Sequence, residues 1–385
     1  MQLSDDQISD LIKVRHALHQ TPEISGEEQE TAAKISRYLK RFEPDNIVVG
    51  LGGHGVAAIF DSGRPGSSVT VRCELDGLPI QETGDLPHRS KTSGKGHQCG
   101  HDGHMAIMLG VAALLDKGRP VRGRAVLLFQ PAEETGKGAK AVTADPQFAA
   151  IRSDHFISLH NLPGYNAHRI LLKPGSVNCA SRGMRIGLTG KTAHASMPET
   201  GVSPALAMAE IMGALNAAST PEHMDENFAL VTVVHANLGE KAFGVSPADA
   251  EIWVTLRTVT DEKMEVLVHA AEAIARDAAD KYGLALEIGY DDIFNGCEND
   301  PALTEHFRAS ANQFGYSVED LDEPLRFSED FGEYGQTAAS AMFFLGAGKD
   351  MPALHNPDYD FPDELIETGA NMFYATVCRL LRQND

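Results

Sequence analysis

Residues 97–104 concentrate more potential metal ligands than any other short segment of the sequence. They read His-Gln-Cys-Gly-His-Asp-Gly-His, so that Cys99 and His101 stand two positions apart. A thiolate and an imidazole bind zinc, manganese, cobalt or nickel, and a carboxylate beside a ligating histidine commonly fixes the tautomer of that ring. The segment therefore predicts a metal site, and the alternative is a buried cysteine beside histidines that are only hydrogen-bonded.

The apolar run 105–115 has the composition and spacing of a buried helix. The potential ligands before it would then lie at the N-terminus of that helix. There, backbone amides without helical partners and the positive end of the helix dipole favour the thiolate form of Cys99. Glycines at positions 100 and 103 let the backbone bend closely around an ion.

Further residues of ligand type follow predicted strands. In an open α/β sheet, the site lies outside the carboxyl ends of the strands, so these side chains are expected to meet at one edge. For each of them, the alternative is a surface position or a helix cap. They are Asp76 after strand 68–73, Glu133 and Glu134 after strand 124–129, His160 after strand 154–159, and His355 beyond strand 341–346.

Glu133 and Glu134 are adjacent, and neighbouring side chains of an extended chain point in different directions. We therefore expect the two carboxylates to have different roles, so that one binds metal while the other transfers protons. A solvated pair of glutamates is the alternative, but the position directly after an apolar strand favours a site.

The length and composition limit the possible classes of protein. A chain of 385 residues exceeds the roughly 250–300 residues at which a single core stops growing, which predicts two domains. The hydrophobic fraction of 42% and the charged fraction of 23% are typical of a soluble globular protein. A formal net charge of −21 repels phosphate backbones, so we expect no nucleic-acid partner.

The compartment is predicted from the cysteines and the apolar runs. The five cysteines are scattered and odd in number, which favours reduced thiols. No apolar run approaches the roughly 18 residues of a membrane helix, and the N-terminal residues lack the pattern of a secretory signal. We therefore expect a cytoplasmic protein that does not associate with a membrane.

The order of helical and strand patterns predicts an α/β domain with an inserted module. The first 175 residues alternate helices and strands, as in a mainly parallel sheet flanked by helices. From about residue 180 the order becomes strand-helix-strand-strand-helix-strand, which predicts a ferredoxin-like α+β module. The predicted boundaries are 1–178 and 291–385 for the α/β domain and 179–290 for the inserted module.

Eight motifs in one order resemble the metal-dependent amidohydrolases that include hippurate hydrolase, auxin-conjugate hydrolases and bacterial N-acyl-amino-acid hydrolases, which are relatives of aminoacylase and glutamate carboxypeptidase. The resemblance extends over almost the whole chain and implies a catalytic domain with an inserted lid or dimerisation domain, and hence a homodimer. The motifs are residues 16–23, 74–80, 99–104, 130–134, 159–163, 190–195, 328–331 and 354–357.

The resemblance also implies roles for individual residues of the metal site. Two divalent ions (manganese, zinc, nickel or cobalt) would be bound, with Cys99 as a bridge between them. Glu133 would be the general base that deprotonates a metal-bound water, which then attacks an amide carbonyl. Asp76 is implied to be a catalytic residue. Both Asp76 and Asp102 would orient ligating imidazoles. The metal ligands would be Cys99, His101, Glu134, His160 and His355.

Two residues of the inserted module are implied to contact the substrate. His194 would supply a catalytic contact to the oxyanion, often across a dimer interface. Arg257 would bind the free carboxylate of the substrate, because a planar guanidinium matches that group with two hydrogen bonds. A surface salt bridge is the alternative role for Arg257.

One segment departs from the family pattern. Residues 242–247 read Ala-Phe-Gly-Val-Ser-Pro, where relatives commonly carry an Asn-containing turn, and Gly244 has no side chain to donate a hydrogen bond. The substrate preference is therefore open. The leading prediction is hydrolysis of the amide of N-acyl amino acids or related small conjugates. The alternatives are a dipeptidase or carboxypeptidase on the same fold, and a metal-stabilised binding protein without catalysis.

Overall fold

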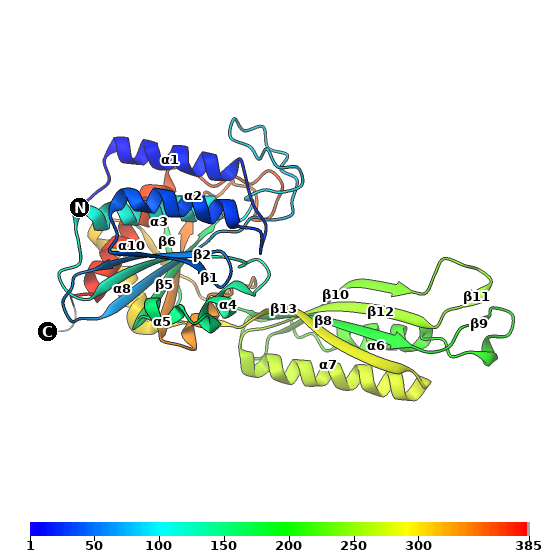
Figure 1. The fold of residues 1–385 in the computed structure, drawn as a ribbon. Coiled ribbons are helices and arrows are strands. Elements are labelled where there is room, and N and C mark those ends of the chain that lie inside the picture. The colour runs from blue at the N-terminus through cyan, green and yellow to red at the C-terminus, as the bar shows by residue number, and fades with distance from the viewer. Residues whose placement is uncertain (383–385) are drawn as a thin grey trace. The chain divides into compact units, whose positions relative to one another are not determined.

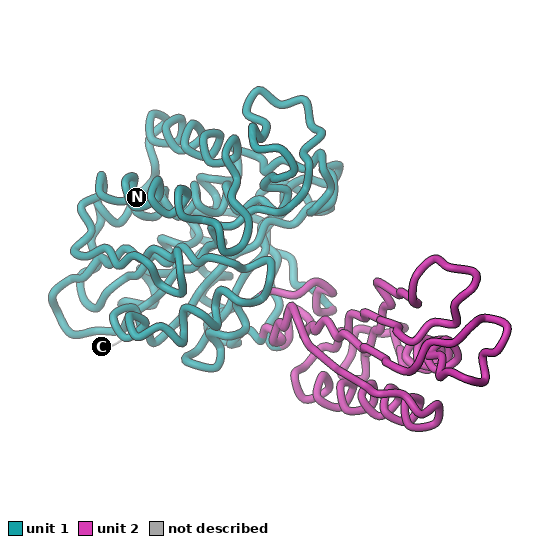
Figure 2. Tube along the Cα trace, turned by 45° about the vertical axis from the view of Figure 1, so that its right-hand side comes forward, with its two compact units in different colours: residues 1–175, 298–322, 330–385 teal, residues 176–297, 323–329 magenta. Residues whose placement is uncertain are grey.

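The computed structural model describes residues 1–382, which fold into two compact units (Figures 1 and 2). The first unit combines Met1–Gly175, Glu298–Asp322 and Asp330–Asp385, and the second combines Ser176–Cys297 and Glu323–Glu329. The second unit thus includes a short return of the chain, Glu323–Glu329, which the sequence pattern did not indicate. The catalytic role predicted for domain 1–178 and 291–385, and the lid or dimerisation role predicted for domain 179–290, remain predictions.

An eight-stranded sheet forms the centre of the first unit. In spatial order its strands are β1 (Asn46–Leu51), β2 (Gly55–Asp61), β4 (Arg124–Gln130), β3 (Ser68–Glu74), β5 (His155–Leu162), β16 (Ala339–Gly346), β6 (Ile170–Leu172) and β15 (Val318–Asp320). The strands from β4 to β16 are parallel and almost entirely buried, as expected for a sheet covered on both faces. The carboxyl ends of β3, β4 and β5 therefore meet at one edge.

Helices cover this sheet on both faces (Figure 1). They are α1 (Asp5–His19), α2 (Gln29–Leu39), α3 (His101–Lys117), α4 (Gly138–Ala144), α5 (Phe148–Ile151), α8 (Pro301–Phe314), α9 (Gly332–Gly335) and α10 (Leu365–Leu380), with the short 3-10 helix η1 (Lys40–Phe42). Helix α3 packs against α1, α2 and α10, whereas α4 contacts α5 and α9. All side chains of α3 from His101 to Leu115 are buried, which confirms the predicted buried helix.

The second unit is a four-stranded antiparallel sheet with two helices. In chain order it contains β8 (Ala180–Thr189), α6 (Ala205–Ala217), β10 (Ala229–Leu238), β12 (Asp249–Thr258), α7 (Asp261–Tyr282) and β13 (Ala285–Phe294). The sheet order β10-β12-β8-β13 is that of a ferredoxin-like fold. The apolar side chains of α6 and α7 form one core with the inward side chains of the strands. The predicted fold class is therefore confirmed for both parts of the chain.

Short elements complete the two units. A small hairpin-like pair in the second unit consists of β9 (Ala193–His194) and β11 (Val245–Ser246), which are antiparallel. The others are the 3-10 helix η2 (Pro198–Thr200), β7 (Gly175–Asn178) and β14 (Cys297–Asn299). Between residues 1 and 382, no helix has both the length and the hydropathy that a membrane span requires.

We expect the substitution Gly103→Ala to destabilise the first unit, although alanine is the better helix former. A Cβ atom at position 103 in α3 would lie 2.3 Å from the ring of Phe361, which is fully buried. Overpacking of this kind costs about 1–3 kcal/mol. Urea unfolding followed by circular dichroism measures the loss.

Gly213→Ala in α6 is the matched control for this substitution. A Cβ atom at Gly213 meets nothing within 4 Å, so only the gain in helix propensity remains, which is about 0.5–1 kcal/mol. Gly213→Ala should therefore stabilise the protein. A Gly103→Ala variant as stable as the wild type would show that Phe361 does not pack against the start of α3 as described.

Candidate metal centre

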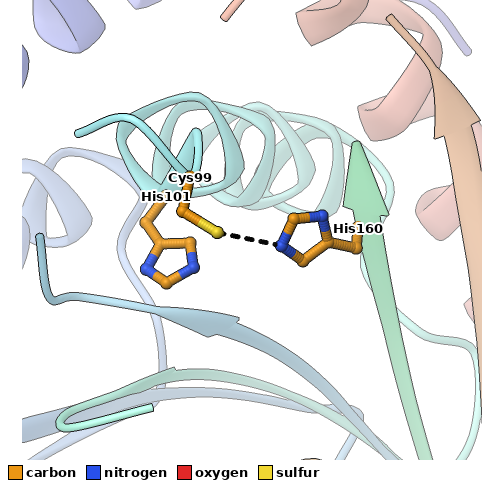
Figure 3. Close-up of side chains that lie close together, drawn as sticks. All are labelled: Cys99, His101 and His160. Atoms are coloured by element: carbon orange, nitrogen blue, oxygen red, sulfur yellow. Dashed lines mark hydrogen bonds between the residues drawn. The ribbon is translucent and has the colours of Figure 1, made fainter. Parts of the chain in front are cut away.

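Cys99, His101 and His160 come together where the N-terminus of α3 faces β5 (Figure 3). The Sγ atom of Cys99 lies 3.3 Å from Nε2 of His160, and all three side chains are buried. One potential ligand atom from each of them lies within 4.8 Å of the others. This spacing suits a common ion, because metal–sulfur and metal–nitrogen bonds are about 2.3 and 2.1 Å long.

A second set of potential ligands shares the same thiol. Nε2 of His355 lies 3.4 Å from Sγ of Cys99 and 3.6 Å from Oε2 of Glu134. Cys99, Glu134 and His355 again offer three ligand atoms within 4.8 Å of one another. Because Cys99 belongs to both sets, the geometry could hold two ions on either side of one sulfur atom.

The two buried imidazoles are oriented as metal ligands must be. Nδ1 of His101 donates to the backbone carbonyl of Asp76 at 2.8 Å, and Nδ1 of His160 donates to that of Asn161 at 2.7 Å. In the neutral form that binds a metal, each ring would therefore carry its lone pair on Nε2. Among the described residues, Nε2 of His101 and Oε1 of Glu134 are buried without a hydrogen-bond partner. A divalent cation would satisfy both atoms, so the residues fit a metal centre.

Burial and neighbouring charges shift the pKa values of Glu134 and His101 at the centre. Burial raises the pKa of Glu134 to about 7, and the nearby carboxylates of Asp76 and Glu74 add to this shift. Burial alone would lower the pKa of His101, but the hydrogen bond to Asp76 and the charges of Glu74 and Glu134 outweigh it and raise the pKa to about 10. The shift of His101 has the sign expected beside buried carboxylates, whereas the shift of Glu134 is mainly an effect of burial.

Glu133 and Glu134 both face this cluster, which corrects the expectation that they would diverge. Oε2 of Glu133 and Oε1 of Glu134 lie 4.0 and 3.8 Å from Nε2 of His101. The residues have left β4 and form a turn that follows Ala132, whose φ is +51°. The alternation of an extended strand therefore no longer applies to them. Only Glu134 belongs to the set that contains Cys99 and His355.

Asp76 supports two potential ligands at once. The carboxylate of Asp76 lies 3.5 Å from Nδ1 of His101. The backbone carbonyl of Asp76 is closer to the same atom, at 2.8 Å. Its Oδ2 accepts hydrogen bonds from the hydroxyl of Ser25 at 2.7 Å and from the backbone N–H of Glu134 at 3.0 Å. Asp76 thereby joins the end of β3 to the turn after β4.

Asp102 does not make the predicted contact with a ligating imidazole. Its Oδ2 lies 2.9 Å from Nδ1 of His19 and accepts a hydrogen bond from Arg15 at 3.1 Å, and both partners belong to α1. Asp102 follows His101 in the helix, where its side chain points to another face of α3. Because adjacent residues of a helix point in different directions, Asp102 and His101 contact different neighbours.

A buried polar network that the sequence did not reveal lies beside the cluster. Nδ1 and Nε2 of His104 lie 2.6 Å from Glu74 Oε2 and 2.6 Å from Asn161 Oδ1, and His104 forms a further group of potential ligands with Glu74 and His101. Arg72 forms ion pairs with Glu74 and, at 2.6 Å, with Asp330. Asp330 lies within the motif at 328–331, and this motif is the sequence feature that could have identified Asp330 as part of the site.

His194 and Arg257 belong to the second unit, and their implied roles remain predictions. Nδ1 of His194 accepts hydrogen bonds from the backbone N–H of Ser196 at 3.1 Å and from its hydroxyl at 2.8 Å. Nη1 of Arg257 donates to the carbonyl of Arg326 at 3.0 Å and to Ser328 Oγ at 2.9 Å. A Cβ atom at Gly244 would meet open space, so the absence of a side chain there is not a packing requirement.

The family model described as peptidase family M20/M25/M40 matches residues 70–379. Hippurate hydrolase of Campylobacter jejuni subsp. jejuni is 30% identical over 372 residues, which cover 96% of this chain and 96% of that protein. N-acetyl-L-cysteine deacetylase of Bacillus subtilis is 31% identical over 380 residues, which cover 97% of this chain and 89% of that protein. The crystal structure of a dinuclear metal binding peptidase of the M20 family from Bacillus subtilis matches with a TM-score of 0.83 at 26% identity, covering 98% of this chain and 99% of that chain. Together with the geometry around Cys99, these matches show that the chain belongs to peptidase family M20/M25/M40.

Proposed function

We propose that this protein is a metal-dependent amidohydrolase that cleaves the amide bond of N-acyl amino acids or related small conjugates. The observation that carries the proposal is the thiol of Cys99 shared between two sets of potential ligands, with the carboxylate of Glu133 next to them. The related hippurate hydrolase and N-acetyl-L-cysteine deacetylase support the substrate class.

The metal site would bind two divalent ions through the predicted residues. Sulfur, imidazole and carboxylate donors accept manganese, zinc, nickel or cobalt, so the donor set is compatible with each of these ions. When bound, such ions supply a water of lowered pKa and polarise the amide carbonyl of the substrate. The proposed ligands are Cys99, His101, Glu134, His160 and His355.

Glu133 is the proposed general base. Its Oε1 accepts a hydrogen bond from the backbone N–H of Asp330 at 3.3 Å, while its Oε2 lies on the side of His101. This arrangement holds the carboxylate at the edge of the ligand cluster but outside both sets that contain Cys99. Glu133 would accept a proton from the attacking water and return it to the nitrogen of the leaving amine.

The second unit would contribute the substrate contacts and the dimer interface. Because Nδ1 of His194 accepts hydrogen bonds, its Nε2 carries the proton that an oxyanion contact requires. Arg257 would pair with the carboxylate of the substrate. The edge strand β10 exposes Val234 and Leu238, which supports a homodimer through this unit. A cytoplasmic location is part of the same proposal.

Removal of metal should abolish hydrolysis of N-acyl amino acids, and manganese, zinc, cobalt or nickel should restore it. The physical reason is that the proposed ions would supply the water of lowered pKa and polarise the amide carbonyl, and no other described feature of the centre replaces both effects. The measurement is a rate assay on dialysed and reconstituted protein with acetyl-, benzoyl- and aminoacyl-amino acids. Preference for the aminoacyl substrates would favour the dipeptidase alternative. Metal-loaded protein that binds these compounds without turnover would favour the binding protein.

Glu133→Gln should lower kcat by about 10²–10⁴-fold while the metal content stays the same, because the amide keeps the shape of the side chain but cannot take a proton. Steady-state kinetics and elemental analysis of the same preparation give both quantities. Glu30→Gln, which neutralises an exposed carboxylate of α2, is the control. Turnover at the wild-type rate in Glu133→Gln would rule out this base.

Substitutions in the second unit should separate binding from catalysis. Arg257→Met should raise KM for an N-acyl amino acid by about 10–100-fold, the equivalent of one or two charged hydrogen bonds. His194→Ala should instead lower kcat by about 10²–10³-fold, as expected for an oxyanion contact. Arg276→Met, in which an exposed arginine of α7 is replaced, serves as the control. If both variants changed only stability, their proposed roles would be wrong.

A further inference from the structure

Helix α1 carries a buried arginine that contacts three carboxylates. Nη1 of Arg15 lies 3.1 Å from Oδ2 of Asp102 and 2.7 Å from Oδ1 of Asp360, and its Nε lies 2.5 Å from Oδ1 of Asp363. The guanidinium is fully buried, with no exposed side-chain surface. Burial of so many charges is costly and is a weak source of stability by itself, which points to a positional role for Arg15.

The three carboxylates belong to the two segments that flank the centre. Asp102 stands in the first turn of α3, directly after His101. Asp360 and Asp363 lie in the connection between β16 and α10, which also contains His355. Arg15 therefore links a helix that supplies one proposed ligand to a loop that supplies another, although α1 itself supplies none.

The position of His355 depends more on contacts with neighbouring segments than the positions of His101 and His160 do. Its side chain is 50% exposed, and it lies outside any helix or strand. Its backbone φ is +66°, a conformation that costs a residue other than glycine about 1–3 kcal/mol and persists only where neighbouring contacts impose it. By contrast, His101 is part of α3 and His160 is part of β5.

Several contacts hold the loop around His355 against the rest of the first unit. The backbone N–H of His355 donates to the carbonyl of Gln98 at 2.9 Å, just before Cys99. The amide of Asn161 donates to the hydroxyl of Tyr359 at 2.7 Å. The ion pair of Arg15 with Asp360 is a charged contact next to Tyr359 in this loop, and Nε2 of His88 lies 3.2 Å from Oδ2 of the same carboxylate. Arg15 is thus one of several residues whose contacts hold the loop of His355 close to Cys99.

We propose that Arg15 is a positioning residue that sets the place of His355 relative to Cys99, and that it thereby controls one of the two metal positions. The inference rests on the proposed metal centre. The ion held by Cys99, Glu134 and His355 should depend on Arg15. The ion held by Cys99, His101 and His160 should not, because backbone carbonyls already fix the rings of His101 and His160.

The test is manganese binding to metal-free protein, measured by titration calorimetry and by the electron paramagnetic resonance of coupled manganese pairs. The wild type should bind two ions per chain. Arg15→Met should keep one and bind the other about 10–100-fold more weakly, as is typical when a residue that supports a ligand is lost. Arg15→Lys, which keeps the charge but not the planar fork, should restore only part of the affinity.

A double-variant comparison identifies which ion is affected. His355→Ala should weaken the same ion, and Arg15→Met combined with His355→Ala should weaken it no further. Arg169→Met, which removes an ion pair with Glu319 elsewhere in the first unit, should leave both ions bound. Asp360→Asn tests the link from the loop side, where the carboxylate is 21% exposed, should Arg15→Met fail to fold.

The inference is overturned if Arg15→Met or Asp360→Asn binds both ions as tightly as the wild type. It is also overturned if the two ions weaken equally, because Arg15 would then stabilise the fold without selecting a metal position. Failure of the proposed function looks different: the wild type itself would bind no divalent ion, or would bind two ions and hydrolyse no amide.

Discussion

A buried excess of negative charge at the N-terminus of α3 is the constraint on which the first unit depends. Asp76, Glu133 and Glu134 converge on His101, and the thiol of Cys99 lies at the same place. The low dielectric of the interior strengthens their mutual repulsion, so the arrangement needs bound protons or compensating positive charge. Part of the compensation is built into the chain through Arg72, which forms ion pairs with Glu74 and Asp330. The proposed ions would supply the remainder.

The architecture of the first unit follows from the need to hold these groups at fixed distances. Parallel strands bring the residues after β3, β4 and β5 to one edge of the sheet, and α3 begins at that edge. Gly100, with φ of +92°, provides the turn into α3, and a Cβ atom there would lie 2.4 Å from Oδ1 of Asn161. The close approach of the backbone to β5 therefore requires glycine at this position. The same approach places Cys99 beside His160.

Rigid and adjustable parts are combined in this centre. His101 and His160 belong to regular elements, and each donates a hydrogen bond to a backbone carbonyl. His355 lies in a loop and in a left-handed conformation, so its position depends on contacts made by neighbouring residues. Arg15 on α1 pairs with Asp360 and Asp363 of this loop and is the proposed charged support. A helix far from the ligands in the sequence can thus influence the metal site through one buried side chain.

The sequence by itself determined the fold class, the buried helix and the residues that gather at the strand ends, because hydrophobic periodicity and local ligand spacing are properties of neighbouring residues. Motif order supplied the family, since eight short segments in one order are far more specific than any single one. Only the tertiary structure decided that Asp102 pairs with α1 and that Glu133 and Glu134 share one side of a turn. These facts depend on contacts between segments far apart in the chain and on backbone turns. Neither leaves a local pattern that a reading of the sequence can detect.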